Sequence, residues 1–219
     1  MYIRAIVASF AIFTASQTSA AILDVTVLNP DKSGVDSIVL YAEPLDQPAP
    51  KIERKKIEIT QKDRAFAPHI TVMQRQDEVQ FSNKDDFTHH IYSISGPNRF
   101  SFKLKSGESK ALEAFEPDSS TETVAMGCNI HDWMSGFILI VDTPYFAKTT
   151  KTGSVSFDLH HLGKYRLTLW HPQLKAEDNR LTQIVDISQD QKLTWQLSET
   201  FYEVQPQADE EDFEFLDEY

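Results

Sequence analysis

The strongest constraint on the fold is an alternation of apolar and polar side chains with a period of two residues, which recurs from residue 22 onward. Val79 and Phe81, for example, alternate with polar neighbours, as in a strand with one buried face. Clusters of Asn, Asp, Gly and Pro separate these short runs, and no convincing stretch has the 3.6-residue period of an amphipathic helix. The sequence therefore predicts an all-β chain, in which the wholly apolar run 137–141 is a strand buried on both faces.

The N-terminus has the pattern of a secretory signal peptide. Arg4 precedes the apolar run 5–13, and small and polar residues follow up to Ala20 and Ala21, where we expect cleavage. The apolar run is far shorter than the roughly 20 residues that a transmembrane helix needs. We therefore predict a signal peptide at residues 1–20, no membrane span, and a mature protein exported to the periplasm.

The charge balance is acidic, with a formal net charge of −12 at pH 7. Nucleic acid is therefore a poor candidate partner, because its phosphates would be repelled. Many of the acids lie in the segment 205–219, which we predict to be a disordered tail. A solubilising role is expected for this tail, and a docking role toward a basic partner is the alternative.

The chain contains a single cysteine, Cys128, so an internal disulfide is impossible. An exported lone thiol could be a buried structural thiol, an intermolecular cross-link, a nucleophile or a metal ligand. His131 and Met134 follow it in a Cys-x2-His-x2-Met pattern. A thiolate, an imidazole and a weak thioether, with a second imidazole from elsewhere, form the ligand set of a blue-copper site. Because Cu(I) favours sulfur and Cu(II) favours nitrogen, a rigid mixed set serves both oxidation states.

A second segment strengthens this interpretation. Residues 81–91 run from a strand end through a polar loop to a histidine that re-enters a strand, and they resemble the sequence around the first copper histidine of plastocyanin. The matching positions are Phe81, Asn83, Phe87, His89 and Ile91. The loop 128–134 has the short length of the amicyanin loop. The region 56–143 is thus similar to the plastocyanin/amicyanin branch of the cupredoxins.

The resemblance implies a Greek-key β-sandwich with one type 1 copper ion at one end. It implies that His89, Cys128 and His131 ligate copper in a plane, with Met134 as a long axial ligand. The whole chain is similar to exported bacterial proteins labelled methylamine-utilisation or plastocyanin-like, a label that implies no substrate chemistry. The segments that carry this likeness are 89–93, 127–134, 142–146 and 170–172.

The residues expected to surround the ligands are His90, Asn129, Asn83, Trp133 and Asp132. His90 stands where an asparagine is usual and Asn129 where a serine or threonine is usual, and a hydrogen bond between them would tie the two ligand segments together. Asp132 would favour protonation of His131 by charge attraction. Trp133 would shield the metal or offer an apolar contact.

Two of the assignments have structural alternatives. Cys128 could be an inert buried thiol, and Met134 could pack in the core ahead of the apolar run. A cysteine nucleophile is disfavoured because the motif provides no group to orient the histidine. Haem attachment would need Cys-x-x-Cys-His, and structural zinc would need more Cys or His ligands.

The remaining segments predict a second, smaller β-sandwich. Residues 22–45 are expected to form a first hairpin, and residues 149–170, within a segment 145–200, a second one. Both halves resemble the transthyretin or carboxypeptidase-regulatory sandwich. The cupredoxin domain would then be inserted within a discontinuous sandwich.

We expect the protein to be a one-electron carrier and not an enzyme. Its partner would be a redox protein such as a c-type cytochrome or a dehydrogenase, with a basic docking face that the acidic chain attracts. Two alternatives remain: a copper carrier or store without redox turnover, and a cell-envelope binding module in which copper is incidental.

Overall fold

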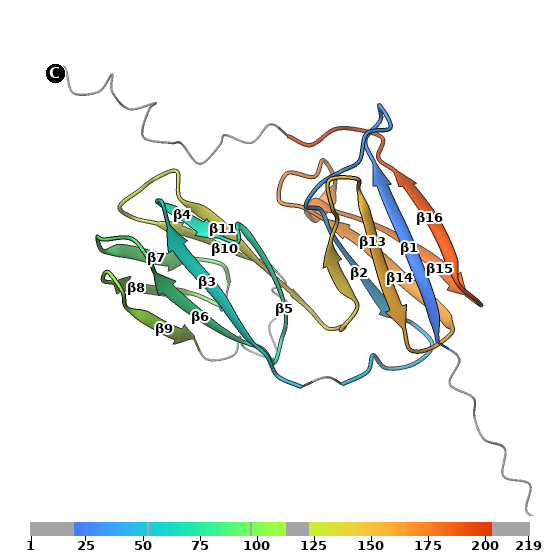
Figure 1. Cartoon of the computed structure of the whole chain (residues 1–219), viewed down its shortest axis with the longest axis horizontal. Helices are drawn as coiled ribbons and strands as arrows, with labels where there is room; N and C mark the ends of the chain where they lie inside the picture. The colour runs from blue at the N-terminus through green and yellow to red at the C-terminus, as the bar shows by residue number, and fades with distance from the viewer. Residues whose placement is uncertain (1–19, 52, 97, 113–122, 203–219) are drawn as a thin grey trace, which may run out of the picture.

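The computed structural model describes residues 20–51, 53–96, 98–112 and 123–202, and this part of the chain is built from strands (Figure 1). The all-β prediction is confirmed. The first nine strands are β1 (Ala21–Leu28), β2 (Val39–Pro44), β3 (Lys56–Lys62), β4 (Ala65–Ala67), β5 (Ile70–Gln74), β6 (Glu78–Asn83), β7 (His89–Ser93), β8 (Phe100–Leu104) and β9 (Ser109–Leu112). The later elements are β10 (Thr123–Cys128), β11 (Ser135–Val141), β12 (Phe146–Lys148), β13 (Ser154–Leu159), β14 (Gly163–Trp170), the short 3-10 turn η1 (Glu177–Asn179), β15 (Arg180–Ile187) and β16 (Gln191–Gln196). The predicted signal peptide, apart from Ala20, and the predicted acidic tail lie outside the described residues.

Strands β3 to β11 form a unit that we call the inserted sandwich. One sheet has the strand order β5-β11-β10-β7-β8, and the other has the order β4-β3-β6-β9. Their inward side chains form a core that contains Ile59, Phe81, Ile91 and Ile138, together with Cys128. The alternation seen at Val79 and Phe81 therefore has its expected cause, since both side chains are buried in this core.

Strands β1, β2 and β12 to β16 form a second unit, the flanking sandwich (Figure 1). Its sheets have the orders β13-β1-β16 and β12-β2-β14-β15. The chain leaves this unit after β2, builds the inserted sandwich, and returns at β12. The expected likeness to transthyretin stays a prediction.

The two expected hairpins within 22–45 and 149–170 are wrong. β1 and β2 lie in different sheets, and β13 and β14 do as well. β1 instead pairs with β13 and with β16, and β2 pairs with β12 and β14. The physical reason is that both connections cross from one sheet to the other, so the paired strands come from distant parts of the sequence.

The two sandwiches pack against each other through an apolar interface. β11 directs Leu139 and Val141 to this side, while Ile138 and Ile140 face the core of the inserted sandwich. On the other unit Val39, Tyr41 and Trp170 complete the interface. Burial on both faces, predicted for residues 137–141, is thus observed in β11, and the flanking sandwich covers its outer face.

Candidate metal centre

The candidate site lies where β6 and β10 end and β7 and β11 begin. Cys128 is the last residue of β10, and it pairs with Ile91 of β7. Because side chains two residues apart on a strand share a face, this pairing places His89 on the same side as Cys128. The Cys128 Sγ atom lies 3.6 Å from His89 Nδ1.

The loop between β10 and β11 supplies the second imidazole. Met134 N–H donates to the carbonyl oxygen of His131 at 3.0 Å, and Cys128 N–H donates to that of Met134 at 3.2 Å. This tight turn brings His131 Nδ1 to 3.8 Å from Cys128 Sγ. The donor atoms of His89, Cys128 and His131 all lie within 4.8 Å of one another.

The two nitrogen–sulfur separations match those expected in a trigonal metal site. Metal–ligand bonds of about 2.0 Å to imidazole nitrogen and about 2.3 Å to thiolate sulfur, the lengths known for zinc, give a nitrogen–sulfur separation of about 3.7 Å at angles near 120°. The observed separations of 3.6 and 3.8 Å agree with this value. The thiolate and two imidazoles also match the donor set of a blue-copper centre.

Met134 lies in the apolar core of the inserted sandwich. Its side chain is 1% exposed and belongs to the same buried cluster as Cys128 and Ile91. A buried position suits both roles that the sequence left open for this residue, an axial ligand and a core side chain.

His90 points away from the three donors, as the alternation of strand β7 requires. Asn129 Nδ2 donates to His90 Nδ1 at 3.2 Å, which leaves the proton on Nε2 for a bond of 2.8 Å to Ser101 Oγ. Asn129 N–H also donates to the carbonyl oxygen of His90 at 3.0 Å. The hydrogen bond that the sequence suggested between His90 and Asn129 is therefore present, and it ties the two ligand segments together.

Asn83 organises the loop that carries His89. Its fully buried side chain donates from Nδ2 to the carbonyl oxygens of Phe87 at 2.7 Å and Leu104 at 2.9 Å. Its Oδ1 accepts from the N–H of Asp85 at 2.9 Å. The loop is thereby held against β6 and β8.

Aromatic rings surround the more accessible side of the site. The ring centroid of His131, which is half-buried, lies 5.3 Å from that of Phe87 and 5.4 Å from that of Trp133. Trp133 thus covers His131, whereas Asp132 is exposed on the loop. Phe87, His131 and Trp133 thus form an aromatic rim beside the donors.

Asp85 is a site residue that the sequence interpretation missed. Its Oδ2 atom accepts a hydrogen bond of 2.7 Å from His89 Nε2. Burial opposes ionisation of Asp85, but hydrogen bonds from His89 and from the backbone of Asp63 and Arg64 hold the pKa of the carboxyl below its usual value. The only sequence signal was the pair Asp85-Asp86 in the polar loop, and the sequence does not say which of the two faces inward.

The thiol and its imidazole neighbour perturb each other in the metal-free chain. Burial raises the pKa of Cys128, but hydrogen bonding with His89 and with backbone amides of Ile130, His90 and His131 outweighs burial and lowers the pKa to about 6. Burial likewise opposes charge on His89, yet its hydrogen bonds to Cys128 and Asp85 raise its pKa. The site is therefore set up to hold a thiolate, the form of cysteine that binds metals.

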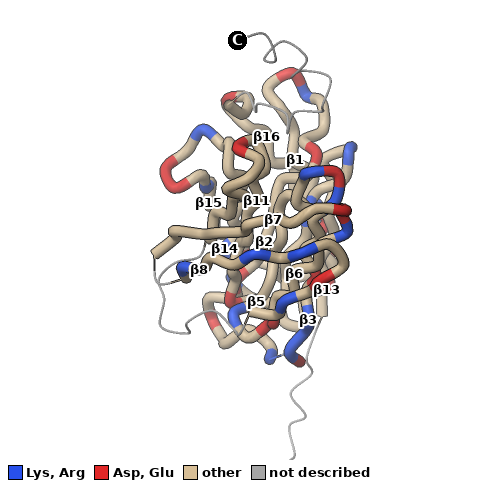
Figure 2. The backbone as a smooth tube through the Cα atoms, turned by 90° about the vertical axis from the view of Figure 1, so that its left-hand side faces the viewer, with Lys and Arg blue, Asp and Glu red and all other residues tan. Residues whose placement is uncertain are grey.

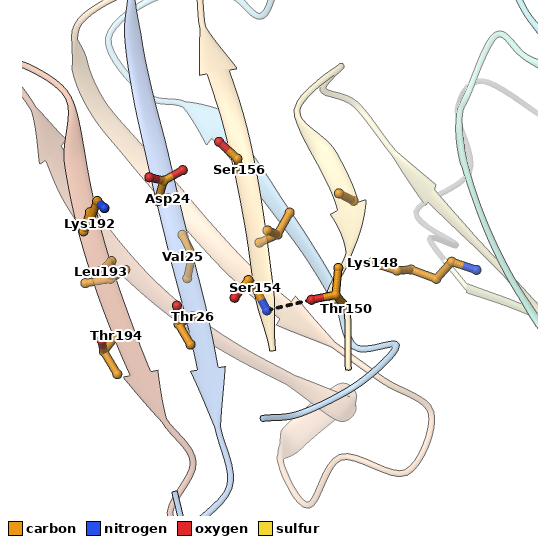
Figure 3. Close-up of a pocket in the computed structure, with 12 residues that line it drawn as sticks. Asp24, Val25, Thr26, Lys148, Thr150, Ser154, Ser156, Lys192, Leu193 and Thr194 are labelled. Atoms are coloured by element: carbon orange, nitrogen blue, oxygen red, sulfur yellow. Dashed lines mark hydrogen bonds between the residues drawn. The ribbon is translucent and has the colours of Figure 1, made fainter. Parts of the chain in front are cut away.

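A hollow of about 710 Å³ lies elsewhere, lined by residues of the strands β13, β1 and β16 and of β12 (Figure 3). Asp24, Thr26, Ser156 and Lys192 are among its lining residues, and none of the described residues that line it is a Cys or a His. It therefore offers no second site of the same kind. Within the described part of the chain, no helix has both the length and the apolar character needed to cross a membrane.

The sequence matches no protein-family model and no curated protein. Solved structures with a similar arrangement include a Cu-containing nitrite reductase from Thermus scotoductus SA-01, at 23% identity and a TM-score of 0.36, over 45% of this chain and 25% of the reductase. The purple cupredoxin from Nitrosopumilus maritimus matches at 17% identity and a TM-score of 0.34, over 39% of this chain and 99% of its own. A Cu(I) form of an amicyanin variant matches at 15% identity and a TM-score of 0.36, over 46% of this chain and 99% of its own. The matched part of this chain spans about a quarter of the nitrite reductase.

The shifted pKa of Cys128 gives a direct test on the metal-free protein. We expect the thiolate absorbance near 240 nm to appear with a midpoint at a pH of about 6, compared with about 8.5 for a free cysteine. Because the chain has one cysteine, Cys128→Ser is the matched control and should remove the transition. A midpoint at or above pH 8.5 would contradict the hydrogen-bonded thiolate.

Proposed function

We propose that the protein is an exported type 1 copper protein that carries single electrons between redox partners. The observation that carries the proposal is the convergence of His89 Nδ1, Cys128 Sγ and His131 Nδ1 at separations suited to a trigonal site. His89, Cys128 and His131 would hold one copper ion per chain, with Met134 as a weak axial ligand. A bound copper ion supplies reversible one-electron exchange between Cu(I) and Cu(II).

The chain's contribution is a rigid set of donors. His89 and Cys128 project from adjacent paired strands, and both are buried. His131 is fixed by the turn that Met134 closes. Donors that keep their positions in both oxidation states reduce the rearrangement that accompanies electron transfer, and this favours a carrier over a copper store.

The proposal includes a location and a partner. The N-terminal pattern at 1–20 supports export to the periplasm. The partner would be a redox protein such as a c-type cytochrome or a dehydrogenase with a basic face, because the chain carries a net charge of −12. Acidic and basic residues are interspersed along the described backbone in the view of Figure 2, so the steering would come from the net charge.

Copper loading of the purified protein tests the proposal. With Cu(II) added, we expect one copper per chain, an intense thiolate-to-copper absorption band and a narrow copper hyperfine splitting in the EPR spectrum. Cys128→Ser should abolish the band while the far-ultraviolet circular dichroism stays unchanged. Copper uptake and colour equal to wild type in that variant would rule out a type 1 site. A coloured site without a reversible potential would favour the copper store.

The adjacent histidines provide a matched pair of variants. His89→Ala should destroy or grossly alter the type 1 spectrum, because it removes a donor at 3.6 Å from Cys128 Sγ. His90→Ala should keep the colour with a small shift in potential, because His90 contacts Asn129 and Ser101 instead. The reverse outcome in absorption and EPR spectra would mean that the strand register is off by one residue.

The role of Met134 is tested by its replacement with leucine. If its thioether is an axial donor, Met134→Leu should raise the reduction potential, because loss of a weak sulfur donor destabilises Cu(II). Met126→Leu, in the same buried cluster, is the matched control and should leave the potential unchanged. Equal potentials in the two variants, measured by voltammetry, would make Met134 a core residue only.

A further inference from the structure

The carboxylate of Asp85 collects three hydrogen-bond donors. His89 Nε2 lies 2.7 Å from Asp85 Oδ2. The N–H of Asp63 donates to Oδ1 at 2.7 Å, and the N–H of Arg64 donates to Oδ2 at 3.2 Å. The side chain of Asp85 is 8% exposed, and that of His89 is 0% exposed. The pair is thus shielded from water on the side opposite the thiolate.

The backbone fixes this carboxylate in place. Asp63 and Arg64 form the two-residue turn between β3 and β4, and both have left-handed backbone angles, with φ of 54° and 57°. Successive residues in this conformation direct their N–H groups toward a common point, which suits an anion. Asn83 Oδ1 holds the backbone of Asp85 from the other side. Asp85 is therefore held at its carboxylate by the turn at 63–64 and at its backbone N–H by Asn83.

We propose, on the basis of the proposed copper function, that Asp85 is a positioning residue that fixes the tautomer of His89 and lowers the reduction potential of the site. When copper is bound, the hydrogen bond would keep the His89 proton on Nε2 and leave Nδ1, the atom that faces Cys128 Sγ, to bind the metal. Carboxylates that bind a ligating histidine in this way orient the ring and make it a stronger donor. The added negative charge favours Cu(II) over Cu(I).

The neighbouring acid provides the matched control. Asp86 lies in the same loop and is exposed, so its charge is screened by water. Asp85→Asn keeps an oxygen acceptor for His89 and removes the charge, whereas Asp85→Ala removes both. Asp86→Asn removes the same charge one residue away.

The first experiment measures copper affinity and potential in the loaded protein. Asp85→Asn should weaken Cu(II) binding about tenfold more than Cu(I) binding, which raises the potential by about 59 mV for a one-electron couple. Asp85→Ala should lower copper affinity by about 10- to 100-fold. Asp86→Asn should leave both quantities at the wild-type value. If Asp85 only supported the turn at 63–64, both oxidation states would weaken equally, and an unchanged potential would overturn the inference.

The second experiment reads the hydrogen bond without copper. In ¹H–¹⁵N NMR spectra of the metal-free protein, His89 should carry a proton on Nε2 that is shifted downfield and protected from exchange. This signal should disappear in Asp85→Ala and persist in Asp86→Asn. If the signal is absent in the wild type, the hydrogen bond from His89 to Asp85 does not form and the inference is wrong. A wild-type chain that takes up no copper would instead overturn the proposed function and the effect on potential, while this spectrum still decides the hydrogen bond.

Discussion

The pairing of β10 with β7 is the constraint on which the candidate site depends. This ladder sets Cys128 opposite Ile91 and so brings the thiol against the imidazole two residues earlier on β7. Every other part of the site is attached to that contact. The turn after Cys128 delivers His131, and the loop before His89 delivers Asp85. A one-residue slip of this ladder would exchange His89 for His90 and disperse the donors.

The donors of the site are already assembled in the metal-free chain. The free energy lost by burying their charged forms is offset by hydrogen bonds from the rest of the fold. Burial of a thiol and an imidazole disfavours their charged forms, yet the surrounding hydrogen bonds reverse that preference for both groups. Backbone amides and a clamped carboxylate provide these bonds, and their positions are set by turns rather than by flexible side chains. Backbone N–H groups that the fold has already ordered thus stabilise the charged form of Cys128 directly and that of His89 through Asp85.

The sequence predicts those parts of the structure that local patterns determine. Alternation predicted the strands, and the spacing after Cys128, with the histidine after residues 81–88, predicted which donors converge. Alternation cannot predict which strands become neighbours, because it records the face of each side chain and nothing about the adjacent strand. The expected hairpins within 22–45 and 149–170 failed for this reason. Asp85 escaped notice because its role depends on the turn at 63–64, some twenty residues away, and because Asp86 has the same chemistry.

β11 is buried on both faces because the flanking sandwich covers one side of the inserted sandwich. The outer face of β11 carries Leu139 and Val141, and the flanking sandwich lies against it. Sheets stack about 10 Å apart, so the two sheets of that sandwich add roughly 20 Å of protein on this flank. Electron tunnelling weakens steeply with distance, so under the proposed copper function this flank would separate the copper from other redox proteins. Under the proposed function, electron exchange would then be confined to the edge that carries the half-buried His131, and redox proteins that collide elsewhere would not exchange electrons with the copper.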